Sequence, residues 1–401
     1  MEDGMPSPSS RPAPSPVRPF PDALDEATRC AALSPSSHNC QPWALARAVT
    51  GQARARAAAF LGLAEDDPGQ VPPLHGGTEY LALALDERRR LVALPAHAVE
   101  MGVSCGAYWR VLLRALAAQG WAVVRSRTVE APGACPFGPV WPREWSLLCV
   151  AALRRGAASD ERLADLGAMA RERRTNRSPY RTALLDPGLL ERLARPAHAA
   201  DGLGGIDVRH VTEPTALEVF ATLLARHAGR DFSHHRAWSE THSFLRRSEA
   251  DARGRGDGFT LTQLFGPMSR THHLARRLAL TPSAMRVLSR VGYDRRLAAG
   301  LATLARCSPA VVAMGFTGVA PGPGDALRGG ARLVDYWLQA TCSGLALHPI
   351  SILVQHDDLR LETQTALGLP GHTFFLARLG RPTTGSPPAP RCAASSRHRP
   401  I

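Results

Sequence analysis

The sequence predicts a globular protein of mixed helices and strands, organised as two similar halves. Helix-compatible segments alternate with short apolar, strand-like segments along the 401 residues. One apolar helix is expected to begin at Gly106 and end at Gly120, and another to begin at Gly330 and end at Gly344. Both spans close on glycine, as helices often do, and both lie near the apolar strands of their half. The similarity of these two helices indicates a weak internal duplication.

The two halves are flanked by segments of different composition. Residues 1–20 are rich in Pro and Ser and are expected to be a disordered tail, as are residues 383–401. The first half covers residues 21–155. The second half covers residues 160–382 and carries a polar, mostly helical insertion at about 231–305, which is long enough to act as a lid.

Each element is predicted from its local pattern. Apolar runs rich in Val, Leu and Ala indicate strands, and longer amphipathic segments indicate helices. Asp186 is a suitable N-cap before Pro187. In the first half we expect helices at 22–33 and 105–120, and strands at 44–49, 89–94, 121–127 and 145–154. In the second half we expect helices at 160–174, 186–197, 214–228 and 326–344, and strands at 205–212, 309–318 and 373–380.

The composition excludes several classes of protein. The net charge is +13, but every basic residue is arginine and the arginines are scattered, so no stripe typical of a nucleic-acid binder is present. The charge can still attract an anionic ligand. The eight cysteines form no CxxC pair, so neither a metal site nor a disulfide framework is expected. Neither a signal peptide nor an apolar run of about 18 residues is visible, so we expect a cytoplasmic protein without a membrane partner.

Two polar segments are candidates for a binding site. The loop "SPSSHNCQPW" places Pro35, Ser36, Ser37 and Asn39 between a predicted helix and a predicted strand. Its prolines stiffen the backbone, and its hydroxyls and amide can bind a flat polar heterocycle. On physical grounds alone, an ordinary helix-to-strand connection with local side-chain bonds is the favoured interpretation of the loop.

The second segment is "RERRTNR", residues 171–177. Arg173, Arg174 and Arg177 lie beside Thr175, a combination that suits a phosphate group. On its own, the run could also be a solvated charged face.

Together the two segments resemble the signatures of the FMN-dependent nitroreductase superfamily. "SPSSHNCQPW" is similar to its PS-x-x-N-x-QPW loop, and "RRTNRSPY" to its Arg-x-Ser/Thr-x-Arg/Lys segment. Ordinary members have the basic segment first, whereas here it follows the loop by about 135 residues. That order resembles the long fused, Acg-like branch, over about residues 22–391. The resemblance implies an α+β nitroreductase fold built as a tandem pseudo-dimer, with two mixed or antiparallel sheets flanked by helices.

The resemblance also implies a role for each matching residue. Arg173 and Thr175 match the phosphate-binding pair, and Arg177 matches the cation near the pyrimidine edge of the flavin. Pro349, Ile350 and Ser351 match the segment beside flavin N5, where family members often carry an acidic residue and glycine. The implied FMN-binding set is Pro35, Ser36, Ser37, Asn39, Arg173, Arg174, Thr175, Arg177, Pro349, Ile350, Ser351 and Arg391.

Some assignments remain alternatives. Arg391 resembles the arginine that closes the phosphate site, although Arg378 or Arg381 could serve instead. His38 is a candidate general acid or a structural part of the loop. No second pair of signatures is visible, so one FMN per chain is expected.

The sequence therefore predicts an FMN-dependent oxidoreductase acting on a small molecule. It transfers hydride through flavin N5, either as an NAD(P)H-dependent reductase or as a dehydrogenase of a small organic, natural-product-type substrate. The alternatives are a non-catalytic flavin-storage protein and, with least support, a basic nucleic-acid-binding protein. A fused pseudo-dimer needs no second chain, so a monomer is expected.

Overall fold

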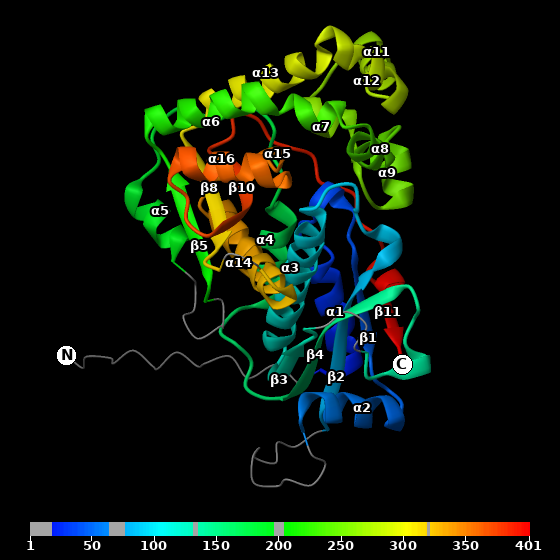
Figure 1. The fold of residues 1–401 in the computed structure, drawn as a ribbon. Coiled ribbons are helices and arrows are strands. Elements are labelled where there is room, and N and C mark those ends of the chain that lie inside the picture. Colours follow the sequence, from blue (N-terminus) through cyan, green and yellow to red (C-terminus); the bar gives the residue numbers. More distant parts are fainter. Residues whose placement is uncertain (1–17, 64–76, 131–134, 196–203, 319–320) are drawn as a thin grey trace, which may run out of the picture.

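The computed structural model describes residues 18–63, 77–130, 135–195, 204–318 and 321–401. Helices and strands are mixed in two separate main sheets, each flanked by helices, which confirms the predicted fold class (Figure 1). A disordered tail was expected at residues 1–20. Residues 1–17 of it lie outside the described residues, and the first helix begins at Phe20.

The first sheet belongs to the N-terminal half and has the order β11-β1-β2-β4-β3. Neighbouring strands are antiparallel, except that β11 runs parallel to β1. Helices α1 and α3 pack on one face, and α2 packs on the other. The elements are α1 (Phe20–Ala31), β1 (Trp43–Arg47), α2 (Gly51–Leu61), β2 (Glu79–Asp86), α3 (His97–Ala117), β3 (Trp121–Thr128), β4 (Trp145–Arg155) and β11 (His398–Pro400).

The second sheet has the order β5-β8-β10-β9, with antiparallel neighbours throughout. Helices α5 and α14 pack on one face, whereas α6, α13 and α15 cover the other, with α16 alongside (Figure 1). The elements are α4 (Leu163–Glu172), α5 (Pro187–Ala194), β5 (Ile206–Val211), α6 (Pro214–His227), β8 (Ala310–Phe316), α14 (Pro323–Cys342), β9 (Ala346–Pro349), α15 (Ile352–Gln355), α16 (Asp357–Leu367) and β10 (His372–Gly380).

Helices α3 and α14 cross at the centre of the molecule and join the two halves. A Cβ atom on Gly106 would lie 2.2 Å from the carbonyl oxygen of Leu327, and one on Gly330 would lie 2.0 Å from that of Val103. The prediction that these glycines begin their helices is wrong, because both lie inside longer helices. They allow two backbones to approach more closely than any residue with a side chain would permit.

The insertion in the second half is helical, as predicted. Its small core contains Trp238, Leu261, Leu280 and Met285. The helices stand above the end of the N-terminal sheet and beside the second sheet (Figure 1). They are α7 (Gly229–Ser233), α8 (His235–Ser243), α9 (Glu249–Arg255), α10 (Leu261–Phe265), α11 (Arg270–Ala279), α12 (Pro282–Leu288) and α13 (Tyr293–Arg306), with the short strands β6 (Leu245–Arg246) and β7 (Phe259–Thr260).

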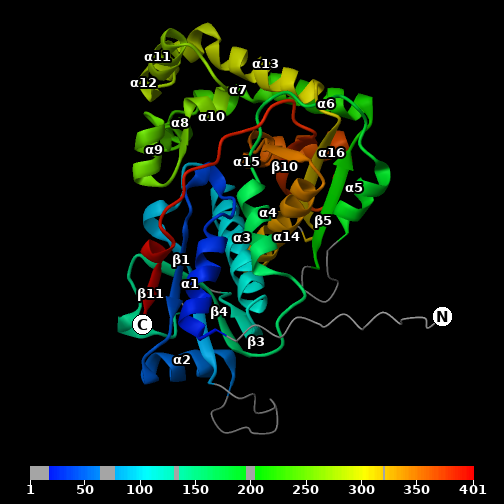
Figure 2. The same cartoon turned by 180° about the vertical axis from the view of Figure 1, so that it is seen from behind.

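The segment after β10 corrects the prediction of a disordered tail at 383–401. It runs from the second half past the insertion and reaches the first sheet, where β11 pairs with β1 (Figure 2). The Ile401 side chain is buried, and its backbone N–H donates to the carbonyl of Arg47 at 2.9 Å. A Pro/Ser-rich composition was misleading here, because specific backbone pairing and one apolar side chain hold the segment in place. We call residues 381–401 the C-terminal arm.

One predicted strand is wrong. Residues 89–94 form the end of a short 3₁₀ turn and a bend, and the strand lies earlier, at β2. The alternation of apolar residues in "EYLALALD" indicates this strand, whereas three consecutive arginines precede Leu91. Among the described residues, no helix is both long and apolar enough to span a membrane.

Candidate functional site

A cavity of about 290 Å³ lies between the two halves, close to the helix crossing. We call it the central cavity. The loop, the basic segment at 171–177 and the C-terminal arm all contribute to its wall, although they lie far apart in the sequence. Apart from Ile350, every residue predicted to bind the cofactor lines it, together with His38. These are Pro35, Ser36, Ser37, His38, Asn39, Arg173, Arg174, Thr175, Arg177, Pro349, Ser351 and Arg391. The backbone N–H of Ile350 donates to Leu376, and its side chain is buried beside a neighbouring cavity.

The loop has an unusual backbone. His38, Asn39 and Gln41 adopt φ values of +51°, +51° and +50°. Residues other than glycine seldom adopt this left-handed region, which costs roughly 1–2 kcal/mol per residue, although Asn and His are among the more tolerant. The loop therefore holds a conformation that the surrounding structure must enforce.

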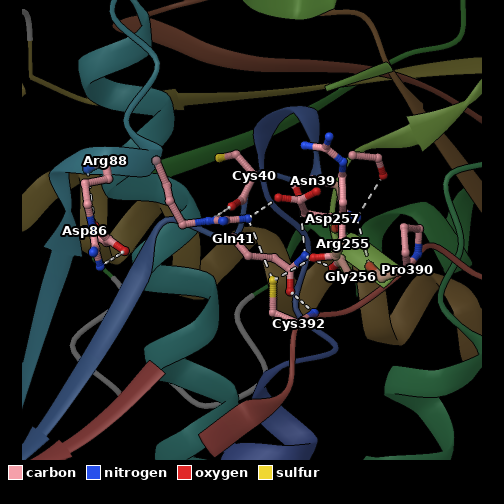
Figure 3. A network of polar contacts seen from close by, with 12 residues as sticks. Asn39, Cys40, Gln41, Asp86, Arg88, Arg255, Gly256, Asp257, Pro390 and Cys392 are labelled. Carbon is pink, nitrogen blue, oxygen red and sulfur yellow. Dashed lines mark hydrogen bonds and ion pairs between the residues drawn. The ribbon is translucent and has the colours of Figure 1, made fainter. Parts of the chain in front are cut away.

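That enforcement comes from polar contacts to the insertion and the C-terminal arm (Figure 3). Asn39 Nδ2 donates to the carbonyls of Gly258 at 3.0 Å and Pro390 at 2.9 Å. The Gln41 side chain donates to the carbonyl of Gly256 at 2.8 Å and accepts from the backbone N–H of Cys392 at 3.0 Å. The loop is thus clamped between two segments that are more than 200 residues away in sequence.

The basic segment leaves the end of α4. Helix α4 ends at Glu172, and Thr175 then forms a parallel bridge with Leu347 at the edge of the second sheet. The backbone N–H of Asn176 donates to the Leu347 carbonyl at 3.0 Å, and its side chain donates to Thr384 at 2.7 Å. These contacts fix the direction in which the neighbouring arginines leave the chain.

The arginines of the central cavity lack negatively charged partners. Within the described part of the chain, Arg173, Arg174, Arg177 and Arg391 form no ion pair with a carboxylate. Arg173 is 5% exposed, its guanidinium stacks on Trp337 at 4.7 Å from the ring centre, and its Nε has no hydrogen-bond partner. Arg391 instead donates to Asn39 Oδ1 at 2.6 Å and to the Leu33 carbonyl at 3.0 Å.

Burial changes the acidity of these side chains. Burial, followed by repulsion from Arg391 and Arg174, lowers the pKa of Arg173 well below its ordinary value. Burial also lowers the pKa of Arg177 to about 10, and burial with repulsion from Arg174 lowers that of Arg391 to about 10. Buried cations of this kind are costly unless an anion neutralises them. The cluster therefore fits a phosphate group, for which guanidinium groups are well matched.

Part of the wall of the central cavity is apolar and includes aromatic side chains. It includes Val103 and Ala107 from α3, Leu333 and Trp337 from α14, and Phe374 of β10. Together with the donor-rich loop, this apolar surface suits a flat ring system with polar edges.

Several side chains at the wall of the central cavity form a series of hydrogen bonds in which each donor and acceptor can be assigned. Ser37 Oγ donates to Glu100 Oε2 at 2.5 Å, so this hydroxyl must accept from His38 Nδ1 at 3.1 Å. His38 Nε2 then accepts from the hydroxyl of Thr241 at 3.0 Å. Gln355 Nε2 donates to the other Glu100 oxygen at 2.8 Å. The carboxylate of Glu100 is thereby held by two neutral donors.

His38 does not have the properties of a general acid at neutral pH. Its pKa is lowered to about 3, chiefly by burial and further by His97 and Arg177. The ring is therefore neutral, and both of its nitrogens are engaged in the hydrogen-bond chain. The structure supports the alternative in which His38 is part of the loop architecture.

Two alternatives to Arg391 lie elsewhere. Arg378 is fully buried and donates to Ser308 Oγ at 2.7 Å and to His348 Nδ1 at 2.9 Å. The side chain of Arg381 is exposed. Neither residue lines the central cavity, whereas Arg391 does.

Several cavity residues were not predicted from the sequence. Glu100, Thr241, Gln263 and Trp337 all line the central cavity. A signal existed for Glu100, because the apolar spacing of Met101, Cys105 and Trp109 extends the predicted helix toward the N-terminus. Thr241 and Gln263 carry no comparable signal, since only the folded insertion brings them to the site.

The site contains no arrangement suited to a metal. Within the described ranges, no group of three or more His, Cys, Asp or Glu side chains is close enough to hold a metal ion. The donors that remain are guanidinium, hydroxyl and amide groups, which favour an anionic organic ligand.

Comparison with known proteins identifies the family. The chain is 30% identical over 381 residues to "Probable NAD(P)H nitroreductase PigM" from Serratia sp., covering 93% of this chain and 92% of that protein. The chain belongs to the nitroreductase family. The family predicted from the two signatures is therefore confirmed. No family model matches this nitroreductase.

Solved structures show weaker similarity to this nitroreductase. The FMN-dependent nitroreductase NfnB from Mycobacterium smegmatis, solved in complex with NADPH, is 16% identical, covers 59% of this chain and 97% of its own, and has a TM-score of 0.38. The FMN and NADPH-dependent nitroreductase NfnB from Sphigopyxis sp. is 17% identical, covers 57% and 95% respectively, and has a TM-score of 0.35. The family assignment rests on the relative from Serratia.

Proposed function

We propose that this nitroreductase binds one FMN in the central cavity and acts as an NAD(P)H-dependent oxidoreductase on a small organic molecule. The observation that carries the proposal is a cluster of buried and half-buried arginines without carboxylate partners, which lines the same cavity as the donor-rich loop and an apolar surface. The relatives support it, because their names specify FMN, NADPH or NAD(P)H. When bound, FMN supplies hydride-transfer chemistry.

The arginine cluster would hold the phosphate. Arg173 offers an unpartnered Nε, and Arg391 lies close enough to repel it electrostatically. A dianionic phosphate would offset this repulsion and the cost of burying the cations. Thr175 contributes a hydroxyl to the same wall.

The loop and the apolar wall would hold the flavin ring. The clamped backbone at Ser36–Asn39 can present donors without further loss of conformational freedom. Arg177, which lines the cavity and carries a single long bond of 3.3 Å to the Gln263 carbonyl, would provide positive charge near the ring. A cation there stabilises the anionic reduced form of a flavin.

The same arrangement supports one cofactor per chain and a monomer. Both the loop and the basic segment come from one polypeptide, so a complete site needs no second copy. We expect the native mass to equal that of one chain.

The decisive experiment measures bound flavin. We expect the purified protein to be yellow, with one FMN per chain, and Arg173→Ala to lose most of it while remaining folded by circular dichroism. Arg209→Ala is the matched control, because Arg209 is exposed and pairs with Asp207 on β5. A colourless wild-type protein that fails to bind added FMN, or an Arg173→Ala variant as yellow as the wild type, would refute the proposed site.

Turnover is tested separately under anaerobic conditions. We expect NADPH or NADH to bleach the flavin absorbance, and an added quinone or nitroarene to restore it. A flavin that binds but is reduced by neither cofactor would instead support the storage function, and oxidation of a small alcohol with reduction of the flavin would support a dehydrogenase.

A further inference from the structure

A second cavity of about 220 Å³ adjoins the central cavity beneath the helical insertion. We call it the side cavity. His38, Thr241, Pro349 and Ser351 line both cavities and form the wall between them. The side cavity is further lined by Leu94, Phe232, Trp238, Leu301, His348 and Ile352. It is therefore separated only by these four shared residues from the cavity in which the cofactor is proposed to bind.

One polar group in the side cavity has a defined direction of hydrogen bonding. His348 Nδ1 lies 2.9 Å from Arg378 Nη1, and a guanidinium can only donate. His348 Nδ1 must therefore be the acceptor, and its ring proton must be on Nε2. No described residue accepts a hydrogen bond from Nε2. Burial, with Arg177 and Arg378, lowers the pKa of His348 well below its ordinary value, so the ring stays neutral.

Arg378 itself is held rigidly. Its other nitrogens donate to Ser308 Oγ at 2.7 Å and the Ser178 carbonyl at 3.1 Å, and it stacks on Tyr180 at 4.3 Å from the ring centre. Because Arg378 cannot turn away, His348 cannot exchange its tautomer without losing a buried hydrogen bond. His348 is thus a fixed, uncharged donor with 5% exposure.

The remaining wall favours an uncharged aromatic ligand. Phe232 and Trp238 lie edge to face with ring centres 5.4 Å apart, and the indole N–H is already bonded to the Leu280 carbonyl at 2.8 Å. Asp231 accepts from His356 Nε2 at 2.8 Å. An anionic ligand would lose its hydration without meeting an arginine in this wall, and Asp231 already accepts from His356, whereas an aromatic ring would meet apolar surface.

We propose that the side cavity is the substrate site, taking a neutral aromatic molecule whose oxygen or nitrogen acceptor binds His348 Nε2–H. The proposal deepens the proposed function and rests on it for the neighbouring flavin. It names a class of substrate and the donor that orients it.

The test uses a pair of probes that differ in one acceptor. The first is 6-propionyl-2-(dimethylamino)naphthalene, a neutral aromatic ketone, and the second is 2-(dimethylamino)naphthalene, which lacks the carbonyl. Dissociation constants are measured by calorimetry on the protein as purified. We expect the ketone to bind about 5- to 10-fold more tightly, as one hydrogen bond to a buried donor provides.

Two kinds of variant locate the binding. His348→Phe should abolish the preference for the ketone, and His348→Gln, which can accept from Arg378 and donate into the cavity, should restore part of it. Ala237→Phe fills the side cavity from α8 without touching Arg378, and should weaken both probes at least 10-fold. Ala299→Phe, on the exposed face of α13, is the matched control and should leave both constants unchanged.

The outcomes separate this proposal from the proposed function. Flavin content is measured for every variant, and all four should retain it. A ketone preference that survives His348→Phe, or probe binding unaffected by Ala237→Phe, would overturn the substrate site even if FMN is bound. Conversely, the expected probe pattern in a protein that binds no FMN would refute the proposed function and leave the side cavity as a binding site.

Discussion

The two polar walls of the central cavity differ in how far the protein satisfies them. The loop is clamped: Asn39 and Gln41 each bond to the insertion and to the C-terminal arm. The arginine wall is not satisfied in this way. Arg173 is buried and stacked on Trp337, and its Nε has no hydrogen-bond partner. Asn39 and Gln41 therefore have their partners within the protein, whereas the Nε of Arg173 does not.

This contrast separates architecture from binding. Polar groups whose partners are all within the protein stabilise the fold, and removing one leaves its partners unsatisfied. Buried cations without counter-charges destabilise the ligand-free protein, and the binding of an anion offsets this cost. The two walls should therefore respond in opposite ways to truncation.

The largest effect is expected at Arg391, because it belongs to both walls. Arg391→Ala removes a cation from the cluster and also its bonds to Asn39 and Leu33. We expect FMN affinity to fall by about 100-fold, or ~3 kcal/mol, which is typical for loss of a buried charge contact. The measurement is titration of flavin-free protein with FMN. Arg381→Ala, with an exposed side chain on the same arm, is the control; an equal loss there would contradict the assignment.

The second effect is expected at Gln41 in the clamped loop, and it concerns the stability of the protein rather than its affinity for FMN. Gln41→Ala leaves the Gly256 carbonyl and the Cys392 N–H without partners. We expect the free energy of unfolding of the flavin-free protein to fall by ~2–3 kcal/mol. Chemical denaturation measures it, with exposed Gln52→Ala as the control.

The same denaturation experiment sharpens the contrast when applied to the other wall. Arg173→Ala should leave the stability of the flavin-free protein unchanged or raise it, because it removes an uncompensated buried cation. A loss as large as that of Gln41→Ala would show that the two walls do not differ.

A smaller effect concerns pH. His38 has a pKa lowered to about 3 in the folded chain, against 6.5 for a free histidine, mainly through burial. Between these values the unfolded state binds a proton that the folded state does not, so stability falls as the pH is lowered. From pH 6.5 to pH 5, the wild type should lose up to ~2 kcal/mol more than His38→Asn. Exposed His272→Asn should follow the wild type, and parallel curves for wild type and His38→Asn would contradict the expectation.

The smallest effect is expected at Arg174. This half-buried side chain already donates to the backbone carbonyls of Arg171 and Arg173, so it has less to gain from a phosphate. Arg174→Ala should weaken FMN binding by only about 2- to 5-fold, in the range of solvent-screened charges. A loss equal to that of Arg173→Ala would place Arg174 at the centre of the cluster.

Residue identity marks the loop and the arginine segment in the sequence, and the resemblance to two family signatures favours a binding role over an ordinary connection and a solvated face. Stiff prolines beside Ser36 and Asn39, and three arginines around Thr175, are informative without coordinates. The helices and most strands followed from apolar periodicity for the same reason.

Sequence could not predict what only tertiary contact creates. The acceptors at Gly256 and Gly258 are backbone carbonyls, which carry no residue signature. The C-terminal arm was misjudged because its order comes from pairing with β1 rather than from its own propensity. The glycines at the α3–α14 crossing were visible as a repeat, but their purpose depends on a neighbouring helix.

The clamp between Asn39 and Arg391 also has a consequence for synthesis. The two residues are separated by 352 positions, so the contact cannot form until the chain has been synthesised beyond Arg391. Contacts this distant in sequence form late in folding. Under the proposed function, the cavity would therefore acquire its affinity for a phosphate group only at a late stage of folding.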